Sequence, residues 1–264
     1  MVNLPIWMDK LASFDVRIYV KELILISSFT AVLIGVLIPG YTSAEDWSTM
    51  RQEMVKAVES DTFNTRHYLG KEKLDARVIK AMGKVPRHLF VPEYNQRDAY
   101  LNQPLPIGKG QTISQPFIVA LMTDLLEVDE SSKVFELGTG SGYQAAILAE
   151  LVKDVYTIEI VEALGEKAAE LLTSLGYTNV HVRVGDGFFG WPEQAPFDGI
   201  IVTAAGIDVP PALIEQLKPE GKLVIPVGEQ FAVQHLLVIT KHADGSLTQK
   251  SVLPVRFVPI TGEH

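Results

Sequence analysis

Hydrophobic residues follow two alternating kinds of spacing along most of this chain. Short runs rich in β-branched residues, such as KVFEL, DVYTIEIV and FDGIIV, predict strands, whereas YQAAILAELV and PPALIEQL have helical spacing. The apolar run in FDGIIVTAA is typical of a strand that is buried on both faces. This alternation predicts an α/β fold with a doubly wound, mostly parallel sheet, whose ligands bind at the carboxyl ends of the strands.

Residues 45–105 have a different pattern and predict a helical cap that leads into the α/β core. DWSTMRQEMVKAVES has the spacing of a short helix, and the Pro-rich AYLNQPLPIG predicts an extended connector. A second helix is expected to end at two prolines, Pro86 and Pro92. Its apolar face is made of Val78, Ile79, Met82 and Val85. We therefore expect one domain over residues 45–264, with the cap at 45–105 and the α/β core at 106–264.

The first 44 residues are a separate kind of sequence. Residues 23–38, LILISSFTAVLIGVLI, carry no charge; this run is short for a spanning helix, which needs about 20 residues. The run is long for the apolar part of a signal peptide, about 7–15 residues, and the charges before it sum to zero where a leader should be positive. Three interpretations stand: a cleaved leader, an uncleaved membrane anchor, or a true start near Met50 or Met54.

Composition narrows the classes of function. Hydrophobic residues make up 47% of the 264 positions, which is enough for a sizeable core. The net charge is -9 and no Lys/Arg cluster occurs, so nucleic acid is not expected as a partner. The absence of cysteine excludes disulfides and thiolate chemistry, and the six histidines lack the spacing of metal ligands, so no metal site is predicted.

The stretch GTGSG joins a predicted strand to a predicted helix. Glycines at 138, 140 and 142 allow positive φ angles and a close approach of the backbone to a ligand, and the helix that follows presents free N–H groups. A dinucleotide fingerprint would need a third glycine where Tyr143 stands, and the lysine of a phosphate loop is absent. The turn therefore predicts a cofactor of another class.

Acidic residues around this turn favour a cationic cofactor. Glu136 precedes the first glycine, which is unfavourable beside a pyrophosphate but suits the ammonium and sulfonium of S-adenosylmethionine. Glu159 ends the next predicted strand, where it can accept hydrogen bonds from two ribose hydroxyls. Asp186 follows the third strand, the usual place for a contact to the adenine edge. The residues predicted to bind the cofactor are Glu136, Gly138, Gly140, Gly142, Glu159, Asp186 and Gly187.

Several further stretches resemble one enzyme family, the protein-L-isoaspartate O-methyltransferases. They include VPRHLFVPE, LPIGKGQTISQPFIVALMTDLL, ELGTGSGYQAAILAELV and VRFVPITG, and the resemblance covers roughly residues 50–262. It implies a Rossmann-like S-adenosylmethionine methyltransferase fold. It also implies methyl transfer to the free α-carboxylate of L-isoaspartyl residues in damaged proteins, followed by repair to L-aspartyl through a succinimide.

The same resemblance implies roles for residues that lie outside the glycine turn. The active-site serine of the family matches Ser114, and Thr112, Ile113 and Gln115 are expected to line the acceptor pocket beside the methyl donor. Arg256 in VRFVPITG is a candidate to pair with the acceptor. Ser114 has an alternative role as the cap of a helix that begins at Gln115.

Other functions remain as alternatives. A methyltransferase acting on RNA or a small molecule would share the core but lack GQTISQP, and a NAD-dependent oxidoreductase would need the missing third glycine. A membrane-tethered module without activity would not need the acidic and glycine positions. We expect a cytoplasmic monomer, since S-adenosylmethionine is made in the cytoplasm. The alternative is a periplasmic form, or one anchored in the inner membrane through residues 23–38.

Overall fold

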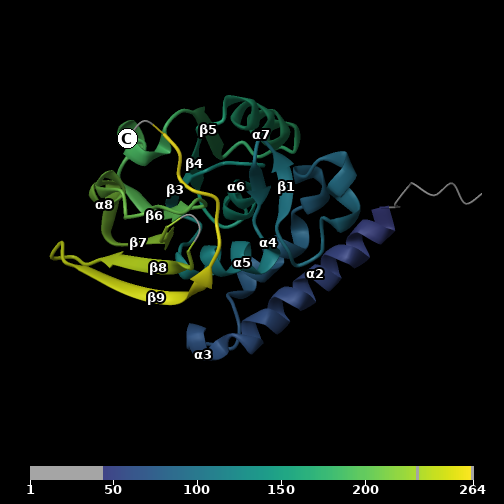
Figure 1. The fold of residues 1–264 in the computed structure, drawn as a ribbon, viewed down its shortest axis with the longest axis horizontal. Coiled ribbons are helices and arrows are strands. Elements are labelled where there is room, and N and C mark those ends of the chain that lie inside the picture. Colours follow the sequence, from purple (N-terminus) through teal and green to yellow (C-terminus); the bar gives the residue numbers. More distant parts are fainter. Residues whose placement is uncertain (1–43, 230–231, 263–264) are drawn as a thin grey trace, which may run out of the picture. The chain divides into compact units, whose positions relative to one another are not determined.

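The computed structural model describes residues 44–229 and 232–262. Figure 1 shows the helices and strands of these residues, coloured in their order along the chain. The apolar segment 23–38, with the predictions made for it, lies outside the described residues. Within the described ranges no helix is both long enough and apolar enough to cross a membrane.

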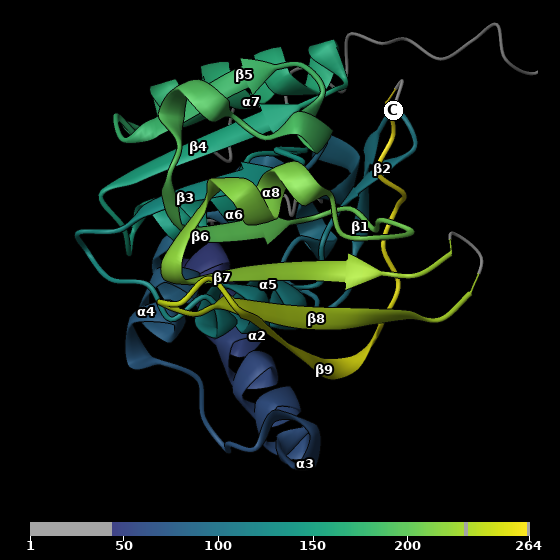
Figure 2. The same ribbon diagram turned by 90° about the vertical axis from the view of Figure 1, so that its left-hand side faces the viewer.

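A seven-stranded sheet forms the centre of the fold, with the strand order β5-β4-β3-β6-β7-β8-β9. Figure 2 shows these strands one above the other. The five strands from β5 to β7 are parallel, and β8 and β9 are added as antiparallel neighbours. The prediction of a mostly parallel, doubly wound sheet is confirmed, although the sequence analysis did not foresee the last two strands. The strands are β3 (Lys133–Leu137), β4 (Asp154–Glu159), β5 (Val180–Val184), β6 (Phe197–Val202), β7 (Leu217–Val227), β8 (Gln234–Lys241) and β9 (Leu247–Val255).

Helices cover both faces of this sheet. Side chains alternate between the faces of a strand, so Val134 and Phe135 of β3 enter two different cores. Val134 packs with the apolar faces of α2, α4, α5 and α6, whereas Phe135 packs with residues of α8. The helices are α2 (Ala44–Asn64), α3 (Arg66–Leu69), α4 (Ala76–Lys84), α5 (Pro116–Leu125), α6 (Tyr143–Ala149), α7 (Glu162–Ser174) and α8 (Pro211–Gln216).

The cap region contains both of the helices expected from its spacing. The first is α2, and the second is α4, which Asp75 caps by accepting a hydrogen bond from the Arg77 N–H. Helix α4 ends before Pro86, as expected, because proline cannot supply the next backbone donor. The predicted extended connector is only partly correct: residues 99–103 form turns and bends, and only β1 (Leu105–Gly108) is extended. Strand β1 pairs with β2 (Gln111–Ile113) in an antiparallel hairpin.

After β9 the chain turns back across the carboxyl ends of the central strands (Figure 2). The side chain of Gln234, fully buried in β8, holds this segment: its amide oxygen accepts from the Phe257 N–H at 2.6 Å, and its amide nitrogen donates to the Phe257 carbonyl at 3.2 Å. Ala205, just after β6, donates to the Val258 carbonyl and accepts from the Ile260 N–H. The C-terminal segment is thereby fixed at the edge where ligands bind in this class of fold.

Replacing Gln234 by Met is expected to lower the free energy of unfolding by about 1–3 kcal/mol, because the N–H and carbonyl of Phe257 lose their partners at little change in volume. Urea unfolding measures this change. The matched control is Gln249→Met, at an exposed position of β9, where a change below about 0.5 kcal/mol is expected. Equal stabilities of the two variants would contradict the anchoring role of Gln234.

Candidate functional site

The glycine turn after β3 is pressed against the end of β6. Gly138 has a φ of 98°, and the Thr203 hydroxyl lies 3.0 Å from the Leu137 carbonyl oxygen and 2.6 Å from that of Gly138. A Cβ atom at position 138 would lie 2.4 Å from this hydroxyl oxygen. Both the positive φ and the missing space therefore require glycine there. Gly140 and Gly142 also have positive φ, and Gly142 is the N-cap of α6.

Glu159 ends β4, as the sequence predicted, and its carboxylate reaches across to the glycine turn. One of its oxygens accepts from the Gly140 N–H at 2.7 Å, and the other accepts from the Val161 N–H at 2.9 Å. These bonds fix the carboxylate, which is only 5% exposed, at the wall of a cavity. A carboxylate oxygen has more than one acceptor direction, so both oxygens retain capacity for hydroxyl donors of a ligand.

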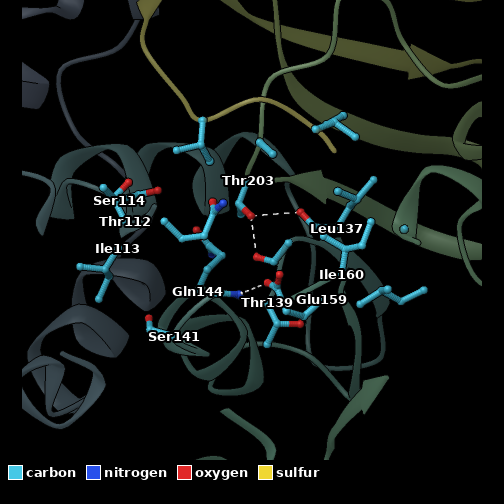
Figure 3. Close-up of a pocket in the computed structure, with 18 of the residues that line it drawn as sticks. Thr112, Ile113, Ser114, Leu137, Thr139, Ser141, Gln144, Glu159, Ile160 and Thr203 are labelled. Carbon is cyan, nitrogen blue, oxygen red and sulfur yellow. Dashed lines mark hydrogen bonds between the residues drawn. The ribbon is translucent and has the colours of Figure 1, made fainter. Parts of the chain in front are cut away.

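The first cavity runs along the carboxyl ends of β3, β4 and β6. Figure 3 shows Thr112 and Ser114 at one end of it and Glu159 and Ile160 at the other. The predicted cofactor residues that line this cavity are Gly138, Gly140, Glu159, Asp186 and Gly187. Gly142 and Glu136 do not line it: Gly142 packs against α7, and Glu136 lies inside the sheet.

A second, larger cavity adjoins the first and has a volume of about 620 Å³. It lies among the end of α2, the first turn of α5 and the segment that follows β9, and it includes two of the predicted acceptor residues, Gln115 and Arg256. Ile113 lines only the first cavity and is almost fully buried. The residues that line both cavities are Thr112, Ser114, Thr203 and Val258. The two cavities therefore meet around Ser114.

Ser114 does not cap a helix, so that alternative is wrong. Helix α5 begins at Pro116, its N-cap is Gln115, and no side chain of the cap residue bonds to the helix. A capping side chain would accept a hydrogen bond from the Phe117 N–H. This N–H instead donates to the side-chain oxygen of Asn102 at 2.9 Å. Among the residues that the structure describes, the Ser114 hydroxyl has no hydrogen-bond partner and stands at the junction of the two cavities.

Arg87 lies behind Ser114 and was missed by the sequence analysis. Its guanidinium is fully buried; Nη2 donates to the Ser114 carbonyl at 2.8 Å and Nε donates to the Ala99 carbonyl at 2.7 Å. It stacks over the Tyr143 ring and forms no ion pair within the described ranges. Burial lowers the pKa of Arg87 to about 10, so the group is still charged at neutral pH. A positive charge thus stands directly behind the serine.

Glu136 is a second buried ionisable group, beneath the glycine turn. Neither of its carboxylate oxygens has a hydrogen-bond partner within the described residues. Burial, helped by the negative charge of Glu159, raises the pKa of Glu136 to about 8, and the neighbouring Thr157 hydroxyl offsets only part of this rise. An unpartnered buried carboxyl of this kind is expensive for folding, and a cationic ligand nearby would favour its ionised form.

The donor set fits S-adenosylmethionine. The buried Glu159 carboxylate lines this cavity together with Asp186, Gly187 and the glycine turn, so it offers acceptors for ligand hydroxyls and a backbone that a ligand can approach closely. The volume of this first cavity is about 70 Å³, which is less than the roughly 300–1,000 Å³ of typical ligand sites. The exposed Ile160 is one of the side chains that line this cavity.

Sequence reasoning also missed Thr203 and the residues that follow Phe257. Thr203 comes directly after the buried strand FDGIIV, at the carboxyl end of β6, and that position was the available signal. Arg87 gave no such signal, because the sequence does not show that its side chain turns inward. Val258, Pro259 and Ile260 reach the first cavity only because the C-terminal segment folds back over the sheet.

Comparisons with known proteins agree with this geometry. Residues 64–264 match the family described as protein-L-isoaspartate(D-aspartate) O-methyltransferase. A protein-L-isoaspartate O-methyltransferase 2 of Syntrophobacter fumaroxidans is 54% identical over 235 residues, which cover 88% of this chain and 95% of that protein. Another, of Polaromonas sp. (strain JS666), is 56% identical over 211 residues, which cover 80% of this chain and 100% of that protein.

Solved structures give the same result for the fold. A protein-L-isoaspartate O-methyltransferase has a TM-score of 0.71 at 27% identity, covering 80% of this chain and 66% of its own. A beta-aspartate methyltransferase from Plasmodium falciparum, solved in complex with S-adenosyl-L-homocysteine, has a TM-score of 0.65 at 23% identity, covering 81% of this chain and 97% of its own.

The raised pKa of Glu136 predicts a pH dependence of stability. The folded protein retains this proton up to about pH 8, whereas the unfolded chain loses it near 4.5. The stabilising contribution of the proton is therefore complete below about pH 4.5 and is lost progressively as the pH rises through 8. Glu136→Gln, which is neutral throughout, should become more stable than the parent between pH 5 and 9. Thermal unfolding of both proteins without added ligand tests this, and parallel pH profiles would refute it.

Proposed function

This chain belongs to the protein-L-isoaspartate(D-aspartate) O-methyltransferase family, and we propose that its two joined cavities are the site of methyl transfer. It is an S-adenosylmethionine-dependent enzyme that methylates L-isoaspartyl residues of damaged proteins. The observation that carries the assignment of the site is the junction at Ser114 and Thr203, which line both cavities. A donor in the first cavity and an acceptor in the second would meet there.

On the cofactor side, we assign Glu159 to the ribose hydroxyls and Asp186 and Gly187 to the adenine. S-adenosylmethionine supplies a methyl group on a sulfonium, which is already activated toward nucleophiles. The glycine turn brings the backbone close to this ligand, and the negative charge of Glu136 is stabilised when a cation binds nearby. Binding of the cofactor is thus expected to favour the ionised form of a carboxyl that is otherwise protonated below about pH 8.

On the acceptor side, the nucleophile is the substrate's own carboxylate. In an isoaspartyl residue the main chain continues through the side-chain carbonyl, so the α-carboxylate is free and ionised at neutral pH. One of its oxygens bonds to the methyl carbon as the carbon–sulfur bond breaks, and no proton moves. No general base is needed, so the contribution of the protein is positioning and exclusion of water.

Ser114 is suited to hold that carboxylate. Its hydroxyl has no other partner in the described residues and can donate to an acceptor oxygen, while the buried guanidinium of Arg87 behind it favours a negative charge. Thr112, Gln115 and Arg256 also line the acceptor cavity. In the methyl ester that forms, the main-chain amide nitrogen on the C-terminal side attacks the ester carbonyl and methanol leaves, carrying the amide proton, which gives a succinimide without the enzyme. Hydrolysis of the succinimide returns part of the material to L-aspartyl.

We further propose that the reaction takes place in the cytoplasm and that a single chain carries it out. The donor is made in the cytoplasm, and both cavities are lined by residues of one chain.

Substitution of Ser114 by Ala should lower the rate of methyl transfer to an isoaspartyl peptide by about 10- to 100-fold, because the acceptor carboxylate loses one hydrogen bond. Binding of S-adenosylhomocysteine, measured by calorimetry, should be unchanged. Ser131→Ala, at an exposed turn before β3, serves as the control and should keep full activity. Full turnover by the Ser114 variant would remove this residue from the mechanism.

The acceptor itself is tested with paired peptides. Methyl groups from labelled S-adenosylmethionine should appear in a synthetic peptide that contains L-isoaspartate and not in the same peptide with L-aspartate, because only the former has a free α-carboxylate within a chain. Labelling of neither peptide, with the cofactor still bound, would retain the fold and cofactor but reject the acceptor.

A further inference from the structure

The acceptor cavity extends well beyond the point of methyl transfer. Its volume of about 620 Å³ is in the range of sites that hold a whole small ligand, and an isoaspartyl side branch at Ser114 occupies only one end. Asp61, in the last turn of α2, and Thr65, just after this helix, also line the cavity. A polypeptide acceptor continues on both sides of the damaged residue, so its neighbouring residues enter this space.

Among the residues that the structure describes, two charged side chains line this cavity, Asp61 and Arg256. They come from different elements, and within the described residues neither takes part in an ion pair. Arg256 is exposed, whereas Asp61 is partly buried and therefore less screened by water. Asp61 is accordingly the stronger fixed charge toward a bound polypeptide.

The Asp61 carboxylate is held in place relative to the reaction centre. One of its oxygens accepts from the Asn102 amide nitrogen at 2.8 Å, and the Asn102 amide oxygen accepts from the Phe117 N–H at 2.9 Å. Phe117 lies in the first turn of α5, three residues after Ser114. Asn102 thus links Asp61 to the helix that follows the catalytic serine, and the second carboxylate oxygen is left for a ligand.

We propose that Asp61 makes the enzyme select isoaspartyl sites that carry a lysine or arginine next to the damaged residue. This inference rests on the proposed function, because it requires the second cavity to hold the acceptor. A cationic neighbour pairs with the fixed carboxylate, whereas an acidic neighbour is repelled by it at short range and with little screening.

The test uses the full-length protein and isoaspartyl peptides that differ only in one residue, Lys, Gln or Glu, placed directly before or directly after the isoaspartate. The measured quantity is kcat/KM for methyl incorporation. For the parent enzyme we expect the Lys peptide to exceed the Glu peptide about fivefold to tenfold at one or both positions, with the Gln peptide between them.

Asp61→Asn separates the charge from the structural contact, because an asparagine oxygen can still accept from Asn102. In this variant the ratio of Lys to Glu peptides should fall to near 1, while activity on the Gln peptide is kept. The control is Glu59→Gln, which removes the same charge from an exposed position of α2 and should leave the ratio unchanged. It thereby accounts for general attraction of cationic peptides to a protein of net charge -9.

Three results would overturn the proposal: an equal rate for Lys and Glu peptides in the parent, a preference that persists in Asp61→Asn, or an equal loss of activity on all three peptides in that variant. The last would mean that Asp61 only supports Asn102. Failure of the proposed function looks different, since the parent enzyme would then methylate none of the isoaspartyl peptides.

Discussion

The close approach between the ends of β3 and β6 is the constraint on which the whole site depends. The Thr203 hydroxyl bonds to main-chain oxygens of Leu137 and Gly138 and leaves no space for a side chain at position 138. Thr203 also lines both cavities. One contact therefore sets the shape of the glycine turn on the donor side and the position of the shared wall on the acceptor side, so that neither can shift alone.

Two buried ionisable groups without an opposite partner in the described residues lie behind the walls of the site. Glu136 is beneath the glycine turn and Arg87 is behind Ser114. Burying an uncompensated charge costs folding free energy, and natural proteins accept such costs mainly at functional sites. The sign of each charge is opposite to that of the ligand group assigned to the adjoining cavity: a carboxyl near the cationic donor and a guanidinium near the anionic acceptor.

The acceptor cavity is assembled from segments that lie far apart in the sequence. The end of α2, the loop that carries Ser114, the end of β6 and the segment after β9 all contribute. Gln234 fixes the last of these by holding both backbone groups of Phe257. The donor side, by contrast, comes from consecutive strand–turn units, which is why it has a local motif and the acceptor side has none.

The α/β class, the mostly parallel sheet, the glycine turn and the position of Glu159 followed from the sequence, because each depends on local periodicity or on a motif within one strand–turn unit. The sequence did not determine the antiparallel strands β8 and β9, the inward turn of Arg87, the failure of Ser114 to cap α5, or the meeting of Asp61 with the acceptor cavity. Those features depend on which distant segments pack together: Asn102 accepts from the N–H that a cap would bind, and Gln234 and Ala205 hold the C-terminal segment at the site. Burial and partner choice are properties of the assembled fold, so only the tertiary structure decided them.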